Sequence, residues 1–176
     1  MLIIVGSLVP TGILLPSAAV PLRVLTLPST CQVPALLFCA IVCGPRSGVI
    51  AAVAYMTIGL VDLPVFHDGG GLRYVLTPGF GFLAGFIPAA WLCGRLGQQH
   101  GMNSLPRLTL TAMAGLIVLQ ISGATSLLAG AILGLWSDPV LSLLYRYTLG
   151  PLPSQLALCT AVGLLALAFR RLLFIK

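Results

Sequence analysis

Charged residues are scarce in this sequence, and acidic residues are almost missing. The chain has 176 residues, of which 7% are charged and only three are aspartate or glutamate. Soluble domains carry roughly a quarter charged residues, so the composition alone indicates a membrane protein. The 59% of hydrophobic residues and the mean hydropathy of +1.10 agree with that class. The length is typical of a single domain.

The cations do not form a basic surface. The nine Lys and Arg residues give a net charge of +6, but they are scattered at the edges of apolar runs. Such positions carry the orientation signals of membrane proteins. Proteins that bind nucleic acids have a basic face or stripe instead, so we expect no nucleic-acid partner.

Catalytic motifs are missing as well. The sequence contains neither the H-E-x-x-H of a metalloprotease nor the G-x-S-x-G of a nucleophile elbow. Gly69–Gly71 lacks the Lys-Ser/Thr of a phosphate-binding loop, so any energy source must be another subunit. The five cysteines lie in apolar segments without a C-x-x-C pair, which favours a packing role. We therefore expect no catalytic residue, no cofactor and no metal.

Apolar segments separated by Gly, Pro and Arg fill the chain. They predict an all-α integral membrane protein, with one domain over 1–176 and six transmembrane helices. The expected spans are 2–15, 31–43, 47–61, 78–94, 108–135 and 151–174. The first run is short for a span of about 20 residues. Pro10 and Pro16 should kink or end its helix.

The distribution of cations predicts the orientation. Six spans place both termini on one side, which would carry Arg46, Arg95, Arg107, Arg170, Arg171 and Lys176. The opposite side would carry Arg23, Arg73 and Arg146, together with all three aspartates. Cytoplasmic loops are enriched in Lys and Arg. We therefore predict a multi-pass protein of the cytoplasmic (inner) membrane with both termini in the cytoplasm.

Residues 59–86 form the longest irregular stretch. Glycines, prolines and polar residues interrupt the apolar sequence there, among them Asp62, Asp68 and Arg73. Membrane proteins tolerate irregular backbone where it meets water or lines a cavity. The stretch therefore predicts an outward-facing lid over a binding site.

Three amide side chains lie in apolar segments, namely Gln32, Gln120 and Gln155. An amide in hydrocarbon costs roughly 2–7 kcal/mol without a partner, so each should face the interior. Each could contact a ligand, or it could bond to neighbouring backbone or water. Gln155 lies in the first turn of the last helix, below a Tyr-rich loop. Because an amide both donates and accepts, it suits a neutral cyclic amide or urea.

The irregular stretch carries a motif that resembles a known family. GLVDLPVF at 59–66 and LTPGFGFLAGF at 76–86 look like the signature of the BioY biotin transporters. Gln32 with GPRSG at 44–48, and GLIV at 115–118 with Gly123, are similar to the family's second and fifth helices. These proteins are substrate-capturing S components of energy-coupling factor transporters. The resemblance implies six helices, biotin held near the extracytoplasmic side, and assembly with a transmembrane coupling subunit and two ATPases.

The last helix departs from the family pattern. Gln155 stands where the family has an Asp that contacts the ligand, and Leu158 stands where it has a Lys. Gln120 takes the place of a common Tyr. The chain therefore resembles a diverged subgroup. A neutral Gln155 can still bond a ureido ring, and it avoids burying an ion pair.

The resemblance and the polar residues together predict a non-enzymatic biotin-capture subunit. The fused ring would lie among Gln155, Gln120 and Gln32. The carboxylate tail would point to water, with Arg73 or Arg146 as the counter-charge. Further predicted contacts are Phe66, Asp68, Tyr74 and Tyr147, although such aromatic residues are also typical of the belt at a membrane surface. The predicted partners are biotin, the coupling and ATPase subunits, and membrane lipid.

Three other functions stay open. The chain could capture another vitamin, which the absence of the Asp/Lys pair favours. It could be a solitary biotin carrier that works without ATPase partners. It could also be a structural membrane subunit without a ligand.

Overall fold

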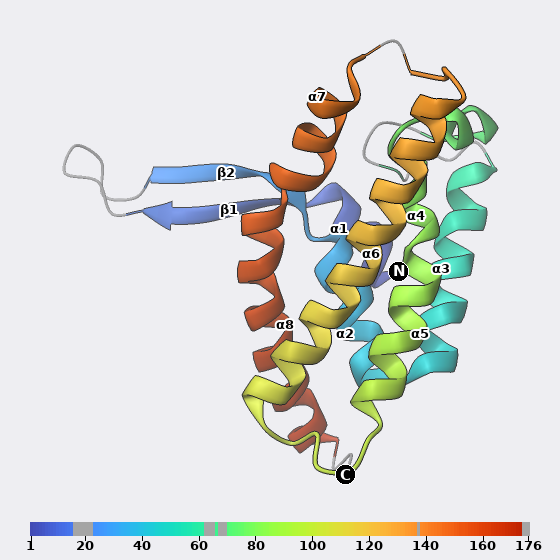
Figure 1. The fold of residues 1–176 in the computed structure, drawn as a ribbon. Coiled ribbons are helices and arrows are strands. Elements are labelled where there is room, and N and C mark those ends of the chain that lie inside the picture. Colours follow the sequence, from blue (N-terminus) through green and yellow to red (C-terminus); the bar gives the residue numbers. More distant parts are fainter. Residues whose placement is uncertain (16–22, 62–65, 67–69, 137, 174–176) are drawn as a thin grey trace.

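The structure, a computed structural model, describes residues 1–15, 23–61, 66, 70–136 and 138–173. The chain begins with helix α1 (Leu2–Leu8) and strands β1 (Pro10–Leu15) and β2 (Arg23–Thr30), followed by α2 (Gln32–Cys43) and α3 (Pro45–Leu60). Next come the 3-10 helix η1 (Leu72–Leu76), α4 (Phe80–Ala84) and α5 (Phe86–Gly97). The last part holds α6 (Leu105–Ile132), α7 (Val140–Leu144), the π-helical turn η2 (Tyr145–Leu149) and α8 (Leu152–Leu172). Figure 1 shows their arrangement.

Within the described residues the helices form six columns. α4 continues into α5, and α7 continues through η2 into α8, while α1, α2, α3 and α6 each form a column alone. Three of these helical runs are long and apolar enough to cross a membrane, namely Phe80–Gly97, Leu105–Ile132 and Val140–Leu172. The prediction of an all-α membrane protein with six helices is confirmed, with one addition at the N-terminal end.

That addition is a two-stranded hairpin between α1 and α2. β1 pairs antiparallel with β2, with Leu15 opposite Arg23, and the hairpin leaves the bundle sideways (Figure 1). The predicted helix over 2–15 is therefore wrong beyond Leu8. Pro10 removes a backbone donor and disfavours helical geometry at the residue before it, and Val9 is extended with φ −99° and ψ 109°. The other five predicted spans lie within about three residues of observed helices.

Proline marks several helix starts. Pro45, Pro106 and Pro153 stand in the first positions of α3, α6 and α8, where a missing N–H costs nothing. The turn before α3 needs a glycine, because Gly44 has φ 87°. The structure also forms α7 and η2 in the Tyr-rich segment before α8, which the sequence predicts to be a loop.

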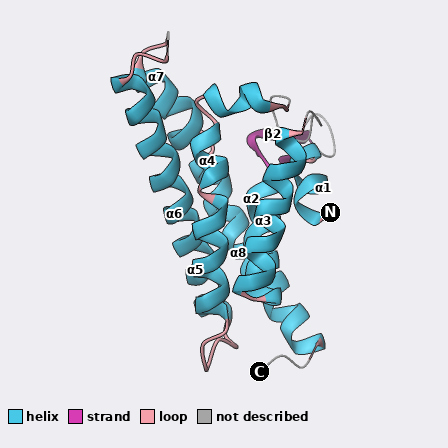
Figure 2. Ribbon diagram, turned by 90° about the vertical axis from the view of Figure 1, so that its right-hand side faces the viewer, coloured by secondary structure: helices cyan, strands magenta, loops and turns pink. Residues whose placement is uncertain are grey.

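Small residues allow the columns to approach closely. A Cβ on Gly115 of α6 would collide with Cys93 of α5, and a Cβ on Gly163 of α8 would collide with Thr109 of α6. Such contacts are typical of helices that pack inside membranes. Seen from the side, the loops lie at the two ends of the bundle (Figure 2).

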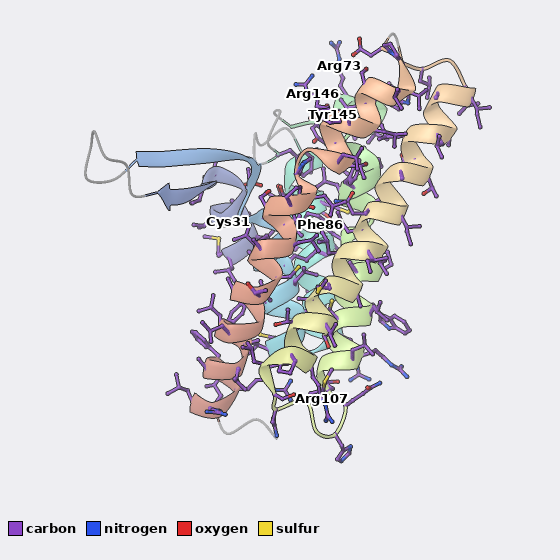
Figure 3. All side chains as sticks on the ribbon, turned by 60° about the vertical axis from the view of Figure 1, so that its left-hand side comes forward. Cys31, Arg73, Phe86, Arg107, Tyr145 and Arg146 are labelled. Atoms are coloured by element: carbon purple, nitrogen blue, oxygen red, sulfur yellow. The ribbon has the colours of Figure 1, made fainter. Side chains whose placement is uncertain are left out.

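The two ends differ in charge. The end with the α2–α3 turn, the α5–α6 loop and the end of α8 carries Arg46, Arg95, Arg107, Arg170 and Arg171. Arg73 and Arg146 lie at the opposite end from Arg107 (Figure 3). Arg170 is only 3% exposed and donates to the carbonyl oxygens of Gly97 and Ile41, at the last turns of α5 and α2. The negative ends of two helix dipoles thus face this buried cation.

Candidate functional site

Aromatic packing holds Phe66 and η1 near the end of α3. The Phe66 ring lies against Gly59, where a Cβ would collide with it, and the Gly71 N–H donates to the Gly59 carbonyl over 2.8 Å. Phe66 contacts Tyr74 at a ring distance of 4.6 Å and Tyr55 at 5.5 Å. Phe66 and Tyr74 are both buried. Phe66 and η1 are therefore packed against the end of α3 through a small apolar cluster.

The same loop meets the last helical column. A Cβ on Gly79 would lie 3.0 Å from the Tyr74 hydroxyl and 3.7 Å from the Tyr147 ring. Tyr147 in turn stacks on Phe82 of α4, with ring centroids 6.2 Å apart. Only a glycine at position 123 of α6 leaves room for the Phe82 ring. These aromatic rings form a wall that joins η1, α4, α6 and η2.

A pair of amides connects α6 and α8 on the interior side. Gln120 Nε2 donates to Gln155 Oε1 over 2.8 Å, and both side chains are half-buried. Gln120 Oε1 is buried and has no hydrogen-bond partner among the described residues. Gln155 Nε2 takes no part in the bond. The pair therefore offers an acceptor and a donor next to each other, without any formal charge.

A second buried polar atom lies in the π-helical turn. Thr148 Oγ1 is buried and has no hydrogen-bond partner within the described part of the chain. Buried polar groups without partners are rare in folded proteins, so each needs an explanation. The sequence pattern does not indicate Thr148, because a threonine in a polar stretch is unremarkable there.

The two arginines of the predicted site lie at the surface. Arg73 is exposed in η1 and lines a hollow of 590 Å³ with Thr57, Leu60, Val61, Gly70, Gly71 and Leu72. Arg146 is exposed, and its guanidinium lies 5.8 Å from the centre of the Tyr147 ring. Figure 3 shows Arg73, Arg146 and Tyr145 at the same end of the molecule.

Gln32 and Asp68 are the other predicted site residues. Gln32 is buried at the first position of α2, directly after β2 and Cys31. Asp68 lies outside the described residues. The structure thus brings Gln120 to Gln155, Phe66 to Tyr74, and Arg146 to Tyr147. It adds Phe82 and Thr148, of which only Phe82 belongs to a motif visible in the sequence.

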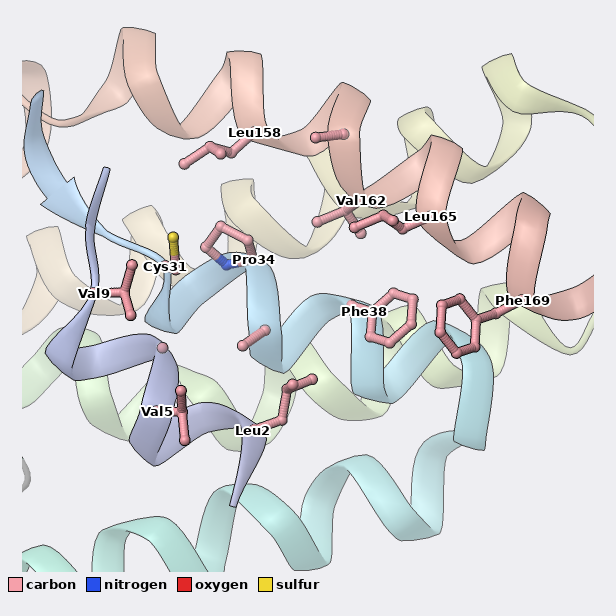
Figure 4. A pocket seen from close by; sticks show the side chains of 13 residues that line it. Leu2, Val5, Val9, Cys31, Pro34, Phe38, Leu158, Val162, Leu165 and Phe169 are labelled. Atoms are coloured by element: carbon pink, nitrogen blue, oxygen red, sulfur yellow. The ribbon is translucent and has the colours of Figure 1, made fainter. Parts of the chain in front are cut away.

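A large groove elsewhere on the molecule is unsuited to a polar ligand. It lies between α1, α2 and α8, has a volume of 440 Å³, and its lining is almost wholly apolar (Figure 4). Leu158 lines this groove rather than pairing with Gln155. A ring with several hydrogen-bonding groups would leave them unpaired there, at a cost of a few kcal/mol. The amide pair is therefore the better candidate for a binding site.

Metal chemistry has no cluster to support it among the described residues. No group of three or more His, Cys, Asp or Glu side chains that could hold an ion is found there. The polar groups that do meet are amides, hydroxyls and aromatic rings. Such a set can bind and orient a small molecule by hydrogen bonds and stacking.

Six helical columns in the described part of the chain, three of them long and apolar enough to cross a membrane, define the class of the protein as a membrane-embedded helical bundle. Its fold is similar to that of the S-component for biotin from an ECF-type ABC transporter. The TM-score is 0.69 at 20% identity, and the match covers 96% of this chain and 85% of that one.

The chain belongs to the BioY family, whose sequence model matches residues 2–174. A probable biotin transporter BioY of Lysinibacillus sphaericus is 31% identical over 144 residues, which are 81% of this chain and 72% of that protein. The biotin transporter BioY of Rhizobium etli is 33% identical over 135 residues, which are 72% of this chain and 71% of that protein. The resemblance found in the loop motif is confirmed.

Proposed function

We propose that this chain captures biotin as the S component of an energy-coupling factor transporter. Membership of the BioY family supports the proposal, because named relatives are biotin transporters. The chain is then a transporter subunit and not an enzyme. Its task is to bind the vitamin reversibly inside the membrane.

The observation that carries the proposal is the half-satisfied amide pair. A ureido ring presents N–H donors beside a carbonyl acceptor. Gln120 Oε1 needs a donor, and Gln155 Nε2 can reach an acceptor without breaking the 2.8 Å bond between the two amides. The ring N–H would donate to Gln120, and the ring carbonyl would accept from Gln155. Each bond to a buried neutral group contributes about 1 kcal/mol, and an unmade one costs more.

The surroundings of the pair suit the rest of the molecule. The rings of Phe82 and Tyr147 stack on each other, and Phe82 lies against Gly123, one turn from Gln120. This apolar wall fits the fused ring and the aliphatic chain of biotin. The carboxylate would then point toward the lid, where Arg73 and Arg146 provide positive charge. Gln32, Phe66, Asp68 and Tyr74 complete the proposed site from α2 and the loop.

The charge difference between the ends supports an orientation. The end with Arg46, Arg95, Arg107 and Arg171 faces the cytoplasm in this proposal, and the lid faces outward. The end of α8 lies at this cytoplasmic end, whereas the chain begins about half-way along the bundle (Figure 1), so the charges support the predicted cytoplasmic position for the C-terminal end alone. The chain lacks a phosphate-binding loop, so a transmembrane coupling subunit and ATPase subunits would supply the energy.

Uptake of labelled biotin tests this function. We expect cells without their own biotin uptake to accumulate biotin when they express the chain with a coupling subunit and ATPases. Gln155→Ala should abolish most of the uptake, whereas Gln99→Ala, a change of the same kind at an exposed position, should not. No uptake from any combination, although the chain is present in the membrane, would contradict the proposal. Equal uptake without the ATPases would identify a solitary carrier instead.

A further inference from the structure

Thr148 differs from the other threonines that bond within their helices. The hydroxyls of Thr57, Thr111, Thr125 and Thr160 each donate to a carbonyl of their own helix, three or four residues earlier. The Thr148 hydroxyl makes no such bond among the described residues, although its oxygen is buried. A buried hydroxyl without a partner costs about 1–3 kcal/mol, which a purely structural threonine would avoid.

The backbone around Thr148 is also unusual. The Gly150 N–H donates to the Tyr145 carbonyl over 2.8 Å, which is the wide i to i+5 bond of a π turn. Such turns are uncommon and occur often at functional sites. The turn is followed directly by α8, which carries Gln155.

The spacing between Thr148 and Gln155 in the sequence gives the distance along the helical run between Thr148 and the amide pair. Gln155 follows Thr148 by seven residues in one helical run, Val140–Leu172. Seven helical residues rise by about 10 Å, and because a π turn lies between the two residues, this spacing gives the height of Thr148 above Gln155 and not the side of the helix on which it lies. The neighbouring Tyr147 stacks on Phe82, which lies against Gly123 of α6. Thr148 therefore lies on the lid side of Gln120 and Gln155, beside the aromatic wall.

We propose that Thr148 is a specificity-determining residue whose buried hydroxyl donates a hydrogen bond to the carboxylate at the end of the ligand's aliphatic chain. The inference rests on the proposed function. The separation of about 10 Å is close to the length of a fused ureido ring with an extended valerate chain. With the ring at the amide pair, the carboxylate reaches the level of Thr148. The bond satisfies the hydroxyl and selects ligands with an acceptor at that distance.

Equilibrium binding to the purified full chain tests the proposal, with biotin and with an analogue that has a methyl group in place of the carboxyl group. Thr148→Val removes the hydroxyl at nearly constant shape, and Thr148→Ser keeps it. We expect Thr148→Val to weaken biotin binding about tenfold and Thr148→Ser by less than about twofold. Binding of the analogue should be equal in all variants. Thr160→Val, on the exposed side of α8, is the matched control and should leave both affinities unchanged.

Thermal unfolding without ligand gives an independent readout. Because Thr148→Val removes a buried hydroxyl without a partner, we expect it to raise the melting temperature by about 1–3 °C. A lower melting temperature would show that the hydroxyl has a partner in the protein, and would overturn the proposal. An unchanged biotin affinity, or an equal loss for biotin and the analogue, would overturn it as well. If Thr148→Val loses affinity only with biotin, the proposal stands. If the folded wild type binds no biotin, the proposed function fails and this inference fails with it.

Discussion

Replacing the two paired glutamines singly and together should separate their structural role from their role in binding. In Gln155→Leu, Gln120 Nε2 loses its acceptor, while Gln120 Oε1 is already without a partner. One hydrogen bond is lost, and Gln120 Nε2 becomes a second polar atom without a partner. Together these changes should lower the free energy of unfolding by about 1–2 kcal/mol. Gln120→Leu removes the unpaired oxygen along with the donor, so its cost should be smaller.

The double variant Gln120→Leu with Gln155→Leu should be close to the wild type in stability. Replacing both partners by apolar side chains of similar shape leaves no buried polar group behind. Its coupling energy in a double-mutant cycle should therefore be about 1 kcal/mol or more, with the double variant more stable than the sum of the singles predicts. Biotin affinity should behave in the opposite way, with a loss of about 1–3 kcal/mol in Gln155→Ala or Gln155→Leu and no measurable binding in the double variant.

Thermal unfolding in detergent and equilibrium biotin binding on the same samples measure both quantities. Gln99→Leu is the control, because Gln99 is exposed in the loop between α5 and α6. Additive stability losses would show that the two amides do not interact. Wild-type affinity in a stable double variant would refute the assignment of the ureido contact to this pair.

Three further changes test the packing around the site. Gly123→Ala should displace the Phe82 ring and weaken biotin binding at least tenfold in a titration. Gly134→Ala is the control: a side chain at position 134 has open space but a strained φ of 67°, so this change should lower stability and leave binding unchanged. Gly59→Ala should displace the Phe66 ring and expose Tyr74, so that the fluorescence of the tyrosines is quenched more strongly by iodide; unchanged quenching would contradict the packing of Phe66 on Gly59. Arg170→Leu should lower the free energy of unfolding by about 2 kcal/mol, because two helix-end carbonyls lose a cationic donor, while biotin affinity changes little.

The helices could be predicted from the sequence because local signals define them. Apolar runs alternate with Gly-Pro and Arg, and Pro45 and Pro153 mark helix starts that the structure confirms. The strands at 10–15 and 23–30 were not predictable in this way. A proline-punctuated apolar run is compatible with a broken helix or with strands, and only pairing between β1 and β2 decides between them.

The candidate site, like the fold, could be predicted only in part from the sequence. The loop motif and the three amides in apolar segments could be found by residue type alone. The bond between Gln120 and Gln155 could not, because the two residues are 35 positions apart in the chain and meet only through the packing of α6 against α8. Thr148 was missed for a related reason. Its importance comes from the bond that its hydroxyl does not make in a π turn, and no sequence pattern records this.

Equilibrium binding of biotin to the purified wild-type chain tests the central claim most directly. We expect saturable binding with one biotin per chain, competed by desthiobiotin, which keeps the ureido ring, and not by lipoate, which lacks it. Competition by a different vitamin with higher affinity would reassign the ligand. No saturable binding at micromolar biotin, in a preparation shown by its unfolding transition to be folded, would contradict the account.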